Sequence, residues 1–139
     1  MPGRLNEEMN MQGAAKRLPF SAEVVREDDL IIFSLEGDLD VSGAQTLRSQ
    51  FAANIQDNDK FVVFNMSGVP YINSAGLGAI IGFLRNIQLR DGHLFLMNPQ
   101  EKVRRVFQIA SLEPKMLFVD TIETARKIIS GEMSIGKQG

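Results

Sequence analysis

The chain has 139 residues, 44% of them hydrophobic and 23% charged, with a formal net charge of −2. This length suits one domain with a single core, and the near-neutral charge excludes the basic field with which proteins bind nucleic acid. Because the chain has no cysteine and only one histidine, His93, disulfides, thiolate sites and histidine metal clusters are excluded.

The first part of the chain predicts an extension followed by a β-hairpin. No apolar run reaches the roughly 18 residues of a membrane span, and the N-terminus lacks the apolar core of a signal peptide, so we expect a cytoplasmic protein without membrane insertion. Residues 1–18 show no sustained hydrophobic period and are expected to be a flexible extension. Strands are expected over Phe20–Arg26 and Leu30–Leu35, with Glu27–Asp29 as the turn between them.

A helix and a buried strand are expected next. Asp40 or Ser42 is a suitable N-cap for the helix, and Asp57–Asp59 ends it. The apolar face of this helix is expected to carry Ala44, Leu47, Phe51 and Ile55. The run Lys60–Met66 is rich in apolar and β-branched residues and predicts a buried strand.

A turn with Gly68 and Pro70 leads from this strand into a central helix that begins near Ser74. Its apolar residues recur at helical spacing, at Leu77, Ile80, Ile81, Leu84 and Ile87. Serine suits the N-cap, where its oxygen accepts a hydrogen bond from a free amide of the first turn. The hydroxyl of Ser74 would then lie at the positive end of the helix, where the fold tolerates a phosphate. Gly92 is expected to provide the left-handed stop after Arg90 and Asp91.

Small residues are the second notable feature of the central helix. Gly76, Gly78 and Gly82 lie inside it, although each glycine costs about 1 kcal/mol relative to alanine. At helical spacing, positions 78 and 82 share one side with Ala75 and Ala79, which leaves a nearly smooth face. Such a face either packs closely inside the protein or lies exposed so that another protein can lie against it. The spacing alone leaves both interpretations open.

The remaining chain continues the alternation of strands and helices. A strand is expected over His93–Met97, and Asn98 and Pro99 form a cap and first-turn pair for the next helix. The apolar face of that helix carries Val103, Val106, Phe107 and Ala110. A short strand over Met116–Val119 precedes the last helix, which Asp120 or Thr121 caps.

The order of elements predicts an α/β domain over residues 19–130. Alternating strands and helices after an opening hairpin indicate a sheet that is mixed rather than wholly parallel. The last helix carries its apolar side chains at Ile122, Ala125, Ile128 and Ile129. Residues 131–139 are expected to be a flexible tail.

Signatures of catalysis are absent from the sequence. A catalytic serine needs a base within reach, and the single histidine lies in a predicted strand. No Gly-Lys-Ser/Thr phosphate loop occurs. Asp38 and Asp40 could be metal ligands, but a solvated turn and a helix cap are the favoured interpretation. We therefore expect neither an enzyme nor a cofactor.

Several motifs resemble one family in their order along the chain. Gly37-Asp38-Leu39-Asp40 precedes a helix, and Met66-Ser67-Gly68-Val69 leads into Asn73-Ser74-Ala75-Gly76-Leu77-Gly78. The run from Asp91-Gly92-His93 to Asn98-Pro99 fits the same pattern. Together they resemble the anti-sigma factor antagonists, which are small single-domain members of the STAS group (sulfate transporter and anti-sigma factor antagonist). The resemblance covers roughly residues 20–130 and implies a mixed β-sheet flanked by about four α-helices.

The resemblance also implies a partner-switching function. Ser74 is then the residue phosphorylated by a partner serine kinase that doubles as an anti-sigma factor. The unphosphorylated protein would bind that kinase and free the sigma factor, and a metal-dependent serine/threonine phosphatase would reset the switch, so regulating transcription. The implied partner-binding residues are Asp38, Asp40, Asn73, Ala75, Gly76, Gly78 and Gly82.

The chain departs from the family pattern at the serine itself. Asn73 and Ala75 stand where the family usually has aspartate and a second hydroxyl residue, and Asn65 stands where an aspartate is common. Asn73 removes a charge that would repel a phosphate, and it also removes a carboxylate that a kinase could recognise. Two alternatives stay open: a STAS adaptor that is never phosphorylated, and a module that binds a nucleotide or lipid head group at the helix N-terminus.

Overall fold

A mixed five-stranded sheet in the order β1-β2-β3-β4-β5 organises the computed structural model, which describes residues 18–133. The strands are β1 Ser21–Glu27, β2 Leu30–Glu36, β3 Phe61–Gly68, β4 His93–Met97 and β5 Leu117–Val119. β1 runs antiparallel to β2, and the remaining neighbours are parallel. The expected mixed α/β sheet is therefore confirmed. Most of the expected extension and tail lies outside the described residues.

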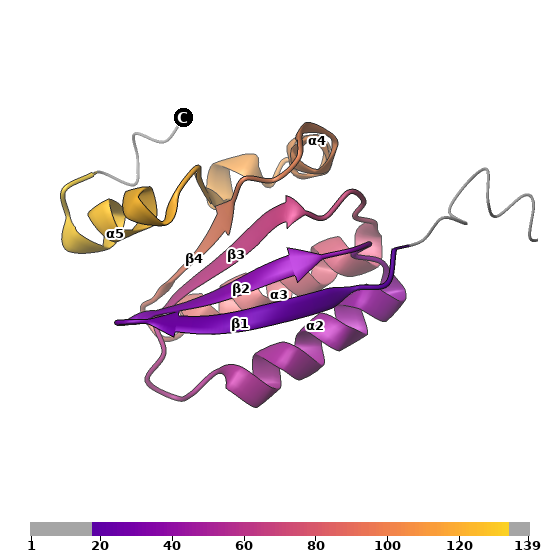
Figure 1. Ribbon diagram of the computed structural model, residues 1–139. Helices are drawn as coiled ribbons and strands as arrows, with labels where there is room; N and C mark the ends of the chain where they lie inside the picture. The colour runs from indigo at the N-terminus through magenta and orange to yellow at the C-terminus, as the bar shows by residue number, and fades with distance from the viewer. Residues whose placement is uncertain (1–17, 134–139) are drawn as a thin grey trace, which may run out of the picture.

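Four α-helices and one short 3-10 helix complete the described part of the chain. They are α2 Val41–Asn54, α3 Ser74–Gln88, α4 Glu101–Ile109, the 3-10 helix Glu113–Lys115 and α5 Ile122–Ser130. α2 and α3 lie on one face of the sheet, and α5 lies on the other (Figure 1). The 3-10 helix is too short to show a period in the sequence.

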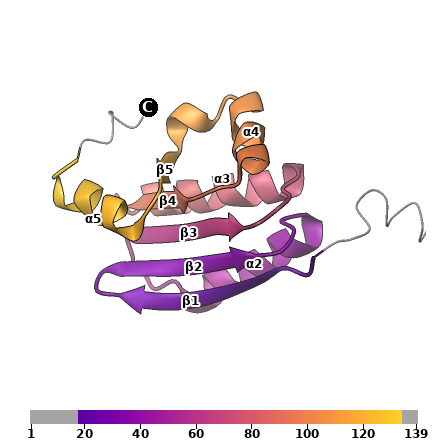
Figure 2. The same ribbon diagram turned by 45° about the horizontal axis from the view of Figure 1, so that its top comes forward.

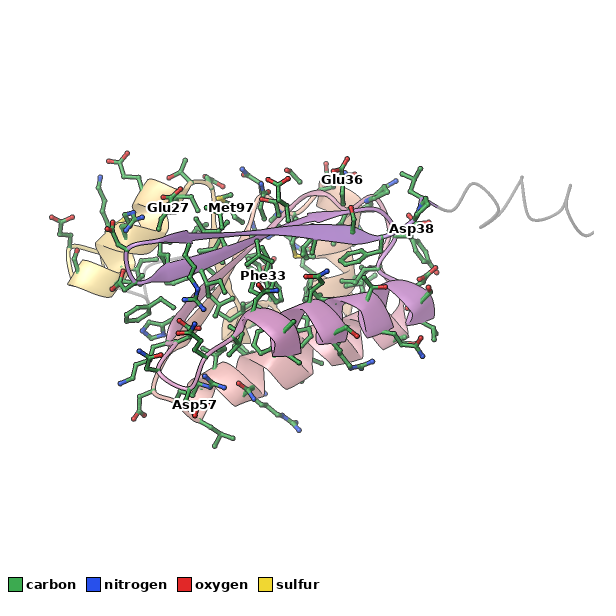
Figure 3. The ribbon with its side chains drawn as sticks, turned by 60° about the horizontal axis from the view of Figure 1, so that its bottom comes forward. Glu27, Phe33, Glu36, Asp38, Asp57 and Met97 are labelled. Atoms are coloured by element: carbon green, nitrogen blue, oxygen red, sulfur yellow. The ribbon has the colours of Figure 1, made fainter. Side chains whose placement is uncertain are left out.

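The main core lies between the sheet and the pair α2 and α3. Alternate residues of the strands point into it, and four phenylalanine rings form its centre. Phe51 stacks on Phe83 with ring centroids 4.4 Å apart, and Phe33 meets Phe64 edge to face at 5.4 Å. Figure 3 shows Phe33 between β2 and α2. The same core extends to α4 through Val103 and Phe107.

A second, smaller core explains why the central strands are apolar on both faces. The other side chains of β2, β3, β4 and β5 pack against Ala125 and Ile128 of α5. The buried strand residues in this cluster are Leu30, Ile32, Val63, Phe95, Met97 and Val119. A strand that is covered on both faces has apolar residues at consecutive positions of its sequence.

Two expected helix boundaries are wrong. The left-handed residue after α3 is Asp91, with φ of 59°, and Gly92 serves a different purpose. A Cβ at Gly92 would lie 2.1 Å from the carbonyl oxygen of Lys60, so close approach of two backbones requires the glycine there. The backbone of Asn98 also adopts the left-handed conformation, with φ of 52°, and its Nδ2 donates to the carbonyl of Asp120 at 2.9 Å. The N-cap of α4 is therefore Gln100.

An ion pair joins β1 to the turn between α2 and β3. The guanidinium of Arg26 donates to both carboxylate oxygens of Asp59 at 2.9 and 2.7 Å, and it also donates to the carbonyl of Asn54. The amide of Gln56 donates to the same carboxylate at 2.7 Å. These hydrogen bonds, that from Arg26 first, hold the pKa of the buried Asp59 carboxyl below its ordinary value, although burial acts in the opposite direction.

Candidate functional site

The carboxyl ends of the parallel strands β2, β3 and β4 lie at one edge of the sheet, which we call the carboxyl edge. The strand arrows of β2 and β3 point to it in Figure 2. The loops 37–40, 69–73 and 98–100 follow these strands, and α2 and α3 begin there. Figure 3 shows Asp38 at this end of α2 and Asp57 at the opposite end.

One isolated bridge fixes the two loops that precede α2 and α3. Leu39 and Ile72 pair in parallel, so the loops prolong the pairing of β2 with β3. The amide of Leu39 donates to the carbonyl of Tyr71 at 2.9 Å, and the amide of Asn73 donates to the carbonyl of Leu39 at 3.3 Å. Both bridge side chains are buried. The register therefore sets Asp40, the residue before α2, beside Asn73, the residue before α3.

Asp40 and Asn73 cap these two helices. Asp40 Oδ1 accepts a hydrogen bond from the amide of Gly43 at 2.9 Å, which confirms the expected cap of α2. Asn73 Oδ1 accepts from the amides of Ala75 and Gly76 at 3.0 and 3.2 Å. Neighbouring caps place the first turns of α2 and α3 at the same edge.

The expectation that Ser74 caps the central helix is wrong, because Asn73 is the N-cap. Ser74 is the first residue of α3 and lies exposed. Since Asn73 accepts from the two amides of the first turn, the hydroxyl of Ser74 is not needed as a cap. Within residues 18–133 that hydroxyl makes no hydrogen bond.

The small residues of α3 do not share one environment. A Cβ at Gly76 would lie 2.1 Å from the carbonyl oxygen of Leu39, so this buried glycine allows α3 to approach the loop that precedes α2. Gly78 and Gly82 are exposed, and a Cβ there would meet no atom within 4 Å. Ala79 is buried and Ala75 is half-buried. Close packing thus requires glycine at position 76, whereas the space beside Gly78 and Gly82 would admit a side chain.

Asp38 holds a neighbouring segment of backbone. Its Oδ2 accepts from the amide of Leu18 at 3.3 Å, and its own amide donates to the carbonyl of Leu18 at 3.0 Å. The side chain is half-buried, whereas Asp40 is buried beneath the first turn of α2. Both carboxylates therefore position backbone at the carboxyl edge.

Sequence reasoning missed three apolar side chains at this edge. Leu18, Val41 and Tyr71 are 52%, 60% and 47% exposed. We call these three residues the apolar rim. The one signal in the sequence was Tyr71 between Pro70 and Ile72, because turns usually carry small and polar residues rather than a large aromatic one.

The described residues support neither a metal site at the carboxyl edge nor His93 as a base for Ser74. Among residues 18–133, no group of three or more His, Cys, Asp and Glu side chains could hold a metal ion. His93 pairs in register with Phe61, the first residue of β3, so it lies at the opposite edge of the sheet from Ser74. In the same described part of the chain, no helix is long and apolar enough to span a membrane.

The STAS domain model matches residues 21–125, and the chain belongs to this family. Among curated relatives, the chain is 29% identical over 116 residues to the anti-sigma F factor antagonist of Lysinibacillus sphaericus, covering 81% of this chain and 98% of that protein. It is also 29% identical over 94 residues to the anti-sigma-B factor antagonist of Staphylococcus epidermidis, covering 68% and 87%.

Solved structures agree with this assignment. The unphosphorylated anti-sigma factor antagonist SpoIIAA aligns with a TM-score of 0.65 and 27% identity, covering 81% of this chain and 97% of that chain. The phosphorylated form of the Bacillus cell fate determinant SpoIIAA aligns with a TM-score of 0.60 and 25% identity, covering 80% and 99%. The family resemblance and the fold expected from it are confirmed.

Proposed function

We propose that this chain is an anti-sigma factor antagonist, not an enzyme, that acts by partner switching. The unphosphorylated protein binds an anti-sigma factor that is also a serine kinase, and phosphorylation of Ser74 releases it. A metal-dependent serine/threonine phosphatase restores the binding form. The observation that carries this proposal is the exposed hydroxyl of Ser74 at the start of α3, beside the start of α2.

The first turn of α3 makes a phosphate on Ser74 compatible with the fold. Phosphorylation adds about −1.5 to −2 charges, and the positive end of a helix favours negative charge. Asn73 caps the helix with a neutral amide, so no carboxylate of the cap repels the phosphate. The switch therefore changes the surface and leaves the fold intact.

Release follows from the cost of burying the new charge. A partner surface that fits a neutral hydroxyl would have to desolvate the phosphate, and an unpaired buried charge costs several kcal/mol. Every 1.4 kcal/mol lowers affinity tenfold. One phosphoryl group is thus sufficient to convert a binding form into a non-binding form.

The seven implied partner-binding residues receive different roles in this proposal. Gly78 and Gly82 contact the partner directly, because both are exposed and have open space beside them. Gly76, Asp38 and Asp40 shape the carboxyl edge through the backbone contacts described above. Asn73 and Ala75 flank the phosphorylated serine.

Two measurements test the switch. Intact mass and peptide mapping of the protein from its native cells, under growth and under stress, should show a phosphoryl group on Ser74 whose amount varies with conditions. The variant Ser74→Ala should keep its affinity for the kinase, and Ser74→Asp should lose about tenfold or more.

Ser49→Asp is the matched control, because Ser49 is exposed on α2 and the variant adds the same charge away from the edge. If phosphate is absent under every condition, and Ser74→Ala and Ser74→Asp bind equally well, partner switching is wrong. The protein would then act as an unphosphorylated STAS adaptor.

A further inference from the structure

We propose that the edge strand β1 is a self-association site, at which a second copy of this chain adds its own β1 in antiparallel orientation. The sheets of the two copies then join into one continuous sheet across a twofold axis that passes through Val24. This inference goes beyond the proposed function and does not depend on phosphorylation of Ser74. Its test uses this chain alone.

β1 is a long edge strand that lacks most of the features by which proteins prevent strand addition. Within residues 18–133 it pairs with β2 alone, in unbroken register from Ser21 to Glu27, and it forms one border of the sheet (Figure 2). Its seven residues include no proline, whereas the opposite border strand, β5, has only three residues. Edge strands are commonly short, bulged or interrupted by proline, because their free backbone groups can pair with another chain. Charged side chains are the remaining protection, and the register decides whether they repel.

The free backbone groups of β1 alternate along the strand. The two-residue turn closes with Glu27 opposite Leu30, which makes this the first hydrogen-bonded pair. Since hydrogen-bonded and non-bonded pairs alternate in an antiparallel ladder, Ala22, Val24 and Arg26 direct their amides and carbonyls away from β2. An axis through Val24 uses all three residues. Val24 then pairs with Val24 of the second copy, and Ala22 pairs with Arg26.

Charge favours this register over its neighbours. A twofold axis keeps each side chain on its own face of the sheet only when it passes through a residue. An axis through Glu23 would place the two Glu23 side chains opposite each other, and an axis through Val25 would place Glu23 opposite Glu27. Like charges directly opposite each other destabilise a strand pair. The axis through Val24 places Glu23 opposite Val25 instead.

The same register covers the apolar side chain that β1 exposes. Val25 is 44% exposed, and it lies on the face of the smaller core, where its partner in β2 is Ile32. Diagonal neighbours across a strand pair lie about 7–8 Å apart, so the Val25 side chains of the two copies become neighbours and extend this core across the axis. On the other face, the half-buried Val24 side chains lie directly opposite each other.

The dimer leaves the carboxyl edge of each copy accessible. A twofold axis perpendicular to the sheet reverses the direction of the strands, so the two carboxyl edges lie at opposite ends of the joined sheet. Ser74 of each copy therefore remains exposed at the start of its own α3. Self-association and binding of another protein at the carboxyl edge are compatible in this geometry.

Charge variants of the full chain test both the dimer and its register by analytical ultracentrifugation at about 10–500 μM. Wild-type protein should show a dimer whose fraction rises with concentration. Val25→Lys places a cation opposite Glu23 of the second copy and should lower the dimer Kd about threefold or more, whereas Val25→Glu should raise it about threefold or more. The double variant Glu23→Lys with Val25→Glu restores opposite charges and should recover at least the wild-type affinity.

Leu89 provides the matched control, because its side chain is 88% exposed at the end of α3 and away from β1. Leu89→Lys and Leu89→Glu make the same changes in net charge and should shift the dimer Kd less than about twofold. A lysine on an edge strand ordinarily opposes strand addition, so tighter association of Val25→Lys is specific to the proposed register. Thermal unfolding of each variant shows that the fold is retained.

Disulfide trapping provides an independent arm, because the natural chain has no cysteine. Opposite residues of a hydrogen-bonded pair have Cα atoms about 5.5 Å apart, within the reach of a disulfide. Val24→Cys should therefore give a covalent dimer on mild oxidation, and the more exposed Leu89→Cys should not. A wild-type chain that stays monomeric at about 500 μM overturns the proposal and leaves this edge for a strand of another protein. Equal dimer Kd values for Val25→Lys and Val25→Glu, or equal trapping by the two cysteine variants, overturn β1 as the interface.

Discussion

At the scale of single residues, the decisive pair is Asn73 and Ser74. An amide and a hydroxyl next to each other can both cap a helix, and the bridge between Leu39 and Ile72 sets which of them does so. Because Asn73 is held before the first turn, its Oδ1 reaches two amides. Ser74 then stays exposed and chemically accessible.

Stability measurements can separate the roles of these two residues. Asn73→Ala should lower the free energy of unfolding by about 1 kcal/mol, because two amides of the first turn lose their acceptor. Ser74→Ala should change it by less than about 0.5 kcal/mol, as expected for an exposed side chain without such a role. Urea unfolding measures both. Equal losses in the two variants would contradict the assignment of the cap.

At the scale of the element, α3 combines two kinds of glycine. Gly76 faces inward, where the backbone of the loop before α2 passes too close for any side chain. Gly78 and Gly82 face outward, where glycine costs helix stability and gains no packing in the monomer. An unfavourable residue at an exposed position indicates a use other than folding.

A matched pair of alanine variants tests this division. Gly78→Ala should stabilise the protein by about 0.5–1 kcal/mol, since alanine favours the helix and no atom lies in its way. Gly76→Ala should destabilise it by about 2 kcal/mol or more, because the new Cβ would overlap the carbonyl of Leu39. Thermal or urea unfolding decides the sign. Stabilisation by Gly76→Ala would refute the close approach.

At the scale of the whole molecule, the ion pair of Arg26 with Asp59 and the candidate site lie at opposite edges of the sheet. Arg26 and Asp59 join β1 to the turn before β3, at the edge where β3 begins. The site lies where β3 ends. A change at the ion pair should therefore alter stability and leave partner binding unchanged.

The ion pair predicts a dependence of stability on pH. The pKa of Asp59 is lower in the folded protein than its ordinary value, which is about 3.9 in an unfolded chain. Its stabilising contribution is therefore fully present above that value and is lost as the pH falls towards the lower, folded pKa. Asp59→Asn should cost about 1–2 kcal/mol at pH 7.

Urea unfolding of wild-type and variant protein from pH 7 to pH 3 measures this effect. The difference between the two proteins should be constant down to about pH 5 and should shrink below about pH 4. Asp57→Asn is a suitable control, because Asp57 is exposed in the same turn. A difference that does not change with pH would contradict the role of the Asp59 carboxylate.

The sequence alone predicted the features that depend on local patterns. Hydrophobic spacing predicted the alternating strands and helices and the mixed sheet. Residues that favour helix starts predicted the cap at Asp40 and the helix that begins near Ser74. Neighbouring residues determine these features, because backbone conformation and side-chain burial repeat over a few positions. The motifs at Gly37–Asp40, Met66–Gly78 and Asp91–Pro99 also indicated the family, because each is continuous in the chain.

Only the tertiary structure decided the features that depend on distant segments. Contacts across the fold decide that Asn73 is the cap of α3. They also give Gly76 and Gly78 different environments, and they pair Arg26 with Asp59. The apolar rim is the clearest case, since Leu18, Val41 and Tyr71 have no common period in the sequence. They lie at the same edge because backbone hydrogen bonds join the segment before β1, the loop before α2 and the loop before α3.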